Sequence, residues 1–323
     1  MKSITKSRLT KILVIVISII LVYILVSQIK FKDVINSIKS VDPIYLIIAF
    51  SLYVISYFFR ALRFRILLNR KVSIRDLFTI VCIHNMINNI LPMRTGELSY
   101  IYLLKKLHNK STGEGIATLF VARVFDFISI SLLFFISALI VQNLPDTIIK
   151  LIWIIAIFMV LIVFFLFILT HFGERFIVVV EKIATKLGLR KKHLVDYLLR
   201  KGMETVDSFK KIGRGKTVEI FLISMGIWLS LYSVNYILVN AMGINLTFCV
   251  VLLGSTFLVF TTVLPIQGMG GFGTYESAWT IAFISLGITK QVAITSGFGI
   301  HILCVSYFLI LGSFGLLRLK FKK

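Results

Sequence analysis

Residues 88–97 read Asn-Asn-Ile-Leu-Pro-Met-Arg-Thr-Gly-Glu and interrupt an otherwise apolar run. A second interruption starts at residue 261 with Thr-Thr-Val-Leu-Pro-Ile-Gln-Gly and continues through a glycine cluster to Glu276. Each apolar run stops at Leu-Pro, passes one or more glycines and resumes after a carboxylate. Non-helical backbone at membrane depth persists only where protein or water satisfies its polar groups. We therefore expect the two breaks to face each other across a cavity, as broken helices do in transporters built from matching halves.

The composition indicates a polytopic membrane protein. The chain is 58% hydrophobic with a mean hydropathy of +0.95, and several apolar runs are long enough to cross a bilayer. We expect an all-α fold with one transmembrane domain over 1–323. Full spans, about six in number at about 20 residues each, are expected near 9–28, 43–68, 115–141, 147–171, 217–241 and 291–317.

The two interrupted stretches are expected to form re-entrant hairpins, because their arms are short for a full crossing of about 20 residues. The first hairpin covers about 76–108, in a first half of residues 1–171. The second covers about 247–287, in a second half of residues 217–323. Residues 172–216 form a basic connector that we expect to be cytoplasmic and amphipathic, or else a solvated loop. The two halves then form an inverted-repeat-like arrangement.

The net charge of +22 is concentrated at the ends of the apolar segments. This distribution follows the positive-inside rule, with an added attraction for anionic lipid, and is not the pattern of a nucleic-acid-binding protein. It predicts a multi-pass protein of the cell membrane with both termini in the cytoplasm.

Charged residues near the breaks are the first candidates for a substrate-binding site. A charge near the bilayer centre costs about 2.5–3.5 kcal/mol on insertion scales, so it needs a partner and usually marks function. Arg94 and Glu97 lie beside the first break, and Arg123 and Asp126 lie three residues apart in an apolar span. We expect ion pairs such as Arg123 with Glu97 and Asp126 with Arg94, or Arg123 with Asp126. Direct contact with a substrate is the alternative.

Amide side chains precede the first break at helical spacing. Asn85, Asn88 and Asn89 follow His84 and form one polar stripe. They would bind a polar headgroup or water in a cavity, or else hydrogen-bond between helices.

The second break contributes Gln267, Gly268, Tyr275 and Glu276 as further candidates. Closely spaced glycines leave backbone N–H groups at the start of a helix, where anions bind, although Glu276 could itself cap those groups. An aromatic stripe of Trp228, Tyr232, Asn235 and Tyr236 would line the same cavity or serve packing. The residues that we expect to break the helices are Pro92, Gly96, Pro265, Gly270, Gly271 and Gly273.

No catalytic set or metal-binding motif is found in the sequence. The histidines are dispersed, the three cysteines lie inside apolar runs, and the Gly268-x-Gly270-x-x-Gly273 pattern follows a membrane segment rather than a strand. We therefore expect no enzyme activity, no cofactor and no metal site.

The sequence resembles the flippase-like integral membrane family, which includes the membrane region of lysylphosphatidylglycerol synthetases and short stand-alone proteins. The resemblance rests on Pro92-x-Arg94-x-Gly96-Glu97, on Arg123-x-x-Asp126, and on Pro265 followed by the glycines and Glu276. It implies a helical membrane fold of two related halves, with lipid translocation as the usual role.

These observations favour a flippase-like transporter that moves a polar-headgroup lipid such as a phospholipid, an aminoacyl-lipid or a polyprenyl-phosphate-linked lipid. The partners are then membrane lipids, and any driving force comes from a gradient or from the lipid distribution. One alternative is an enzyme or accessory protein of glycolipid or lipid modification, with a lipid-modifying enzyme as its partner. Another is a small-solute or ion transporter.

Overall fold

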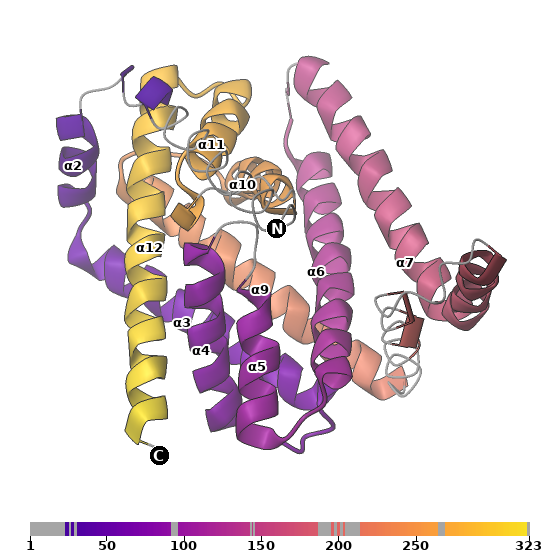
Figure 1. Cartoon of the computed structure of the whole chain (residues 1–323). Helices are drawn as coiled ribbons and strands as arrows, with labels where there is room; N and C mark the ends of the chain where they lie inside the picture. The colour runs from indigo at the N-terminus through magenta and orange to yellow at the C-terminus, as the bar shows by residue number, and fades with distance from the viewer. Residues whose placement is uncertain are drawn as a thin grey trace, which may run out of the picture.

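The computed structural model describes residues 23–25, 27–28, 31–91, 96–142, 144, 146–186, 195–196, 199–200, 203, 214–263 and 269–321. This part of the chain is helical and contains no strand (Figure 1). Its main elements are α2 (Phe31–Lys39), α3 (Pro43–Leu67), α4 (Ile74–Ile90), α5 (Glu97–His108), α6 (Thr112–Ile140), α7 (Asp146–Lys186), α9 (Arg214–Ala241), α10 (Phe248–Val263), η3 (Met269–Gly271), α11 (Thr274–Ser285) and α12 (Lys290–Phe321).

Four of the described helices are long and apolar enough to cross a membrane. They are α3, α6, α12 and the part of α9 from Lys216 to Ala241. These four agree with predicted spans. The span predicted at 9–28 lies mostly outside the described residues. The span predicted at 147–171 falls within α7, which continues as one helix to Lys186 because no proline interrupts it. The predicted connector therefore begins with helix, and most of its remainder lies outside the described residues.

Local signals explain where the helices begin. The side chain of Asp42 accepts a hydrogen bond from the N–H of Ile44 at the start of α3, where Pro43 occupies the first turn. Ser73 caps α4 and Ser111 caps α6 in the same way. Between the spans predicted at 9–28 and 43–68 lies the short helix α2, whose Val34 packs in a small apolar cluster against α12.

The arms of both predicted hairpins are confirmed as short helices. Each pair begins and ends at one end of the molecule. His108 at the end of α5 lies 3.7 Å from Asp76 at the start of α4. We call this end the basic end. It also holds the α3–α4 loop and the start of α9, which are joined by an ion pair of 3.0 Å between Arg70 and Glu219. The end of α12 lies at the same lower edge in Figure 1.

The second hairpin starts and finishes at the opposite end. A cavity of about 540 Å³ there is lined by residues of α2, of the α9–α10 connection and of the α11–α12 connection. Gln291 at the start of α12 donates a hydrogen bond of 3.4 Å to Asp33 of α2. The two helix pairs therefore run into the molecule from opposite ends. The described residue Leu91, at the tip of the first pair, ends α4 in an extended conformation.

The largest core cluster unites both halves of the chain. The long helices α3 and α9 pack along each other, α4 packs against α12, and α10 packs against α6. Close approach of α4 and α12 depends on Gly312 and Gly315, where an added Cβ would clash with Met86 and lie 2.9 Å from Ile83. Large apolar side chains of α3, including Ile44, remain exposed on the outer surface, as a lipid-facing helix requires.

Candidate functional site

The first part of the site is an ion pair inside the helix bundle. Arg63 on α3 lies 2.7 Å from Asp126 on α6, and their side chains are only 2% and 4% exposed. Ser224 and Trp228, both on α9, complete the arrangement. Arg63 donates a hydrogen bond of 2.9 Å to the Ser224 hydroxyl, and Trp228 donates one of 2.9 Å to the Asp126 carboxylate. Three helices therefore converge on a single buried carboxylate.

A second carboxylate extends this arrangement toward the first break. Glu97, the first residue of α5, lies 2.7 Å from Arg123 on α6. Arg123 also lies 3.6 Å from Asp126. Because Arg123 is bound between the two carboxylates, it connects the break to the buried pair. Glu97 and Arg123 each keep about a third of their side-chain surface exposed, at 35% and 33%.

Arg60 on α3 adds a third cation to this group. It is partly buried and interacts electrostatically with Asp126, Arg63 and Arg123. Its Nε atom is buried and has no hydrogen-bond partner in the part of the chain that the structure describes. We call Arg60, Arg63, Arg123, Glu97 and Asp126 the arginine cluster. Within it, three arginines face two carboxylates, so one positive charge has no matching negative charge among the described residues. Such a cluster favours an anion.

The backbone at the first break is held closely against α4. The Gly96 carbonyl lies 3.2 Å from Nδ1 of the buried His84. An added Cβ at Gly96 would clash with the backbone of Asn88, so only glycine fits at this crossing. Buried polar atoms of Asn88 and of Asn85 have no hydrogen-bond partner among the described residues, whereas Asn89 is exposed. These amides remain available to a polar ligand or to water.

The second break has a different construction. Gly270, Gly271 and Gly273 have φ values of +65°, +78° and +83°, a conformation that residues with a Cβ rarely adopt. The carboxylate of Glu276 accepts a hydrogen bond of 2.7 Å from the N–H of Gly273. Its other oxygen lies 2.6 Å from Nδ1 of His301 on α12. The alternative in which Glu276 caps the helix is therefore confirmed, with His301 as an additional partner.

The two breaks meet at a cavity of about 250 Å³. Asn89 lines it from the end of α4, and Gly270 and Gly271 line it from η3, which packs against α4. Asn235 on α9 and His301 on α12 supply further polar groups. The expectation that the breaks face each other across a cavity is thus confirmed for the described residues on either side.

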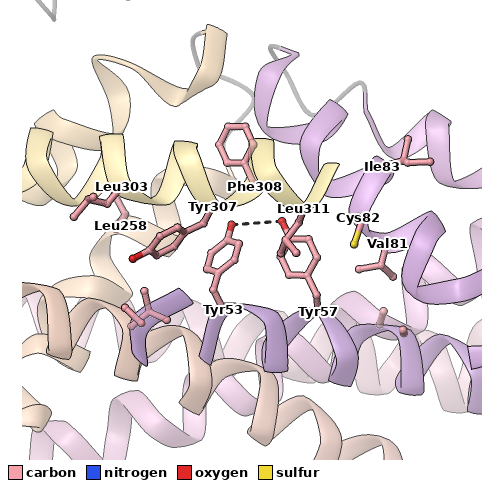
Figure 2. Close-up of a cluster of buried hydrophobic side chains, with 14 of the residues drawn as sticks. Tyr53, Tyr57, Val81, Cys82, Ile83, Leu258, Leu303, Tyr307, Phe308 and Leu311 are labelled. Carbon is pink, nitrogen blue, oxygen red and sulfur yellow. Dashed lines mark hydrogen bonds between the residues drawn. The ribbon is translucent and has the colours of Figure 1, made fainter. Parts of the chain in front are cut away.

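Aromatic rings form much of the remaining wall. Trp228 lines the cavity and hydrogen-bonds to Asp126, so the arginine cluster lies directly behind this ring. Tyr53 on α3 also lines the cavity. Its hydroxyl lies 3.5 Å from that of Tyr57, one turn farther along the helix toward Arg60 (Figure 2). Polar groups therefore follow one face of α3 from the cavity to the arginine cluster.

Comparison with known proteins agrees with this architecture. The family described as "Lysylphosphatidylglycerol synthase TM region" matches residues 11–312, which include every residue of the arginine cluster and of the cavity. This chain belongs to that family. Among curated proteins, a UPF0104 membrane protein of Methanocaldococcus jannaschii is 44% identical over 52 residues. The match covers 16% of this chain and only 22% of the archaeal protein. No solved structure matches the chain.

The structure of this family member brings many of the predicted site residues together. The predicted pair of Arg123 with Glu97 is confirmed, and so is the contact of Arg123 with Asp126. Asn89 and Tyr275 line the cavity, as do three members of the predicted aromatic stripe, whereas Tyr236 packs against Phe248. Glu276 lies behind the cavity wall, bound to His301. The predicted residues Pro92, Arg94, Pro265, Gln267 and Gly268 lie outside the described residues.

Three important residues of this lysylphosphatidylglycerol synthase TM region, Arg60, Arg63 and His301, were not predicted from the sequence. Arg63 lies within the predicted span 43–68 and is a buried partner of Asp126. Its spacing of three residues from Arg60, within the apolar run of α3, would have indicated a shared face. His301 was counted among dispersed histidines, although an ionisable residue inside a predicted span is itself a functional indication.

Proposed function

We propose that this chain is a flippase-like transporter that moves lipids with an anionic headgroup across the cell membrane. The observation that carries the proposal is the polar cavity between the two helix breaks, with the arginine cluster and its excess positive charge directly behind the wall. A phosphate in the cavity would compensate the charge that Glu97 and Asp126 leave unmatched. Arg94, from the first break, would add to this attraction.

The size of the cavity fits a headgroup better than a whole lipid. Its volume of about 250 Å³ is below the range of about 300–1,000 Å³ in which proteins enclose a complete drug-sized ligand. The acyl chains would remain in the bilayer, against the exposed apolar side chains of the outer surface. A headgroup alone would then leave water for the cavity.

Helix packing supports two inverted halves with re-entrant hairpins. In each half a long helix is followed by two short helices joined at a break, and then by another long helix. The helix pair α4–α5 would correspond to α10–α11, α3 to α9, and α6 to α12. The contact of α4 with α12 then has its counterpart in α10 with α6, and the contact of α5 with α6 has its counterpart in α11 with α12. Alternating access in such folds proceeds by movement of one repeat against the other.

The basic end would lie in the cytoplasm. It collects lysines and arginines at the end of α3, of α5 and of α12, as cytoplasmic loops do. In this orientation the span predicted at 9–28 would begin in the cytoplasm, and both termini would lie inside. We propose transport rather than catalysis because the cavity presents amides, hydroxyls and aromatic rings, which are groups that hold a headgroup.

The direct test measures how fast labelled lipid exchanges between the two leaflets of proteoliposomes. Purified protein would be reconstituted with tail-labelled phosphatidylglycerol, phosphatidylcholine or polyprenyl phosphate, and the outer-leaflet fraction followed over time. We expect faster exchange than in empty vesicles, with anionic lipids favoured over phosphatidylcholine. Exchange at the rate of empty vesicles for every lipid would refute the proposal.

A substitution of Arg60 tests most directly whether the site selects lipids by their negative charge. Because Arg60 forms no ion pair with a carboxylate of the described residues, Arg60→Gln should remove attraction for an anion while Glu97 and Asp126 keep their partners. A charge-assisted hydrogen bond is worth about 1.5–3 kcal/mol, so exchange of anionic lipid should fall about 10- to 100-fold at low lipid fraction. The control is Arg70→Gln, since Arg70 is 64% exposed at the basic end. An equal loss for phosphatidylcholine would show that Arg60 does not select an anion.

A further inference from the structure

The pair of Glu276 and His301 places an ionisable group at the cavity that the proposed lipid binding does not require. Glu276 is fully buried, and His301 is 5% exposed. The carboxylate is held from two sides, by the Gly273 N–H and by the His301 ring at 2.6 Å. A histidine in this position can carry one proton, on Nδ1, or two.

The geometry leaves the other edge of the His301 ring facing the second break. Tyr275 stacks on the ring at 4.2 Å between centroids and Phe272 lies at 4.5 Å, so both fix its plane. A Cβ added at Gly271 would lie 3.5 Å from Nε2. His301 and Gly271 both line the cavity. Nε2 can therefore exchange a proton with water in the cavity while Nδ1 stays bound to Glu276.

The other titratable groups around this pair carry no charge at neutral pH. They come from α3, α9, α11 and α12, and they are Tyr53, Tyr232, Tyr275, Cys304 and Tyr307. Asn89 and Asn235 face the cavity from α4 and α9 and do not titrate. Among the described residues, His301 is thus the cavity-lining group whose ring can bind a second proton and become a cation.

We propose that the Glu276–His301 pair binds a proton together with each anionic headgroup, so that transport is coupled to a proton gradient. This inference rests on the proposed function. With one proton on His301 the pair has a net charge of −1, which repels an anion in the adjacent cavity. A proton donated by hydronium in the cavity to the Nε2 lone pair leaves a water molecule and an ion pair of zero net charge. The headgroup and the proton therefore bind cooperatively.

Cooperative binding fixes the direction of coupling. The proton and the lipid cross together, so lipid should accumulate on the alkaline side. For one proton per lipid, a gradient of one pH unit supports an accumulation ratio of about tenfold. A headgroup of charge −1 with one proton is electrically neutral, so an imposed membrane potential should not change the ratio.

The experiment measures the distribution of short-chain fluorescent phosphatidylglycerol between leaflets at steady state. Proteoliposomes would be prepared with pH 6.5 outside and 7.5 inside, with the reverse gradient, or with none, and the outer-leaflet pool would be extracted with albumin. The variants are His301→Gln and Glu276→Gln. The matched control is His108→Gln, because His108 lies at the basic end beside Asp76 and not at the cavity.

In the wild-type protein we expect the inner-to-outer ratio to rise toward tenfold with acid outside and to fall with acid inside. The same response is expected in His108→Gln and no response in His301→Gln. If the wild-type protein exchanges lipid but its inner-to-outer ratio is the same with and without a pH gradient, the proposed coupling is wrong. The proposed function would not be affected by that result. A full response in both His301→Gln and Glu276→Gln would overturn the assignment of the site. Absence of exchange in the wild type would overturn both proposals.

Discussion

The two helix breaks meet at one cavity but depend on different chemistry. At the first, arginines are joined to Glu97 and Asp126, and an arginine keeps its charge at any physiological pH. At the second, Glu276 is joined to His301, whose ring can bind a second proton. One side therefore offers a fixed positive potential, and the other an adjustable charge. On the proposed function, the first break would attract the anionic headgroup and the second would control its release.

This contrast predicts that the largest loss of stability follows substitution of Asp126. Asp126→Asn removes the carboxylate that Arg63 contacts at 2.7 Å and leaves a cation that is 2% exposed without its partner. Breaking a buried ion pair in this way costs about 3–5 kcal/mol. We expect a large loss of folded protein, measured as the melting temperature in detergent by fluorescence-detected size exclusion.

The control for Asp126 is Glu219→Gln. That substitution breaks the exposed pair with Arg70 and should cost less than about 1 kcal/mol. If Asp126→Asn were as stable as Glu219→Gln, the arginine cluster would not be a fixed structural feature, and the contrast between the breaks would be lost.

Gly96 predicts an intermediate effect at the tip of the first hairpin. In Gly96→Ala the new methyl group would clash with the backbone of Asn88, which cannot move as a side chain can. Overpacking of this kind costs about 1–3 kcal/mol. It should also displace Glu97 from Arg123. We therefore expect a large fall in the rate of lipid exchange together with a moderate fall in melting temperature.

The control for Gly96 is Gly115→Ala on α6. Its added Cβ would meet the flexible side chain of Ile101 at 3.3 Å and should be accommodated more easily. Equal melting temperatures and equal exchange rates for the two variants would show that the crossing at Gly96 does not position the site.

Most of the helix arrangement could be predicted from the sequence because it depends on local signals. The length of the apolar runs and the Leu-Pro and glycine signals predicted the ends of the short helices to within a few residues. The spacing of three residues predicted that Arg123 and Asp126 share one face of α6. Arg63 could not be assigned in the same way. Its role requires α3 to lie beside α6 and α9, and that packing depends on contacts between distant residues.

The same reason explains the interpretation of Glu276. Its position three residues after Gly273 suggested a cap, and a cap is present. Its second partner, His301, lies 25 residues away on α12. Only the packing of α11 against α12 brings the two together, so the sequence predicted the local half of the interaction and not the distant half.

Substitution of Glu276 should have the smallest effect on stability. It therefore separates the role of this residue in folding from its role in the response to a pH gradient. In Glu276→Gln the amide oxygen can still accept the Gly273 N–H, so most of the cap is retained, and a substitution that keeps this hydrogen bond should cost about 1 kcal/mol or less. The neutral amide cannot stabilise a doubly protonated His301. Melting temperature should thus change little, while the response of lipid distribution to a pH gradient should disappear. A variant that melts as early as Asp126→Asn would instead show that both breaks rely on their carboxylates for folding, and the division between fixed and adjustable charge would be wrong.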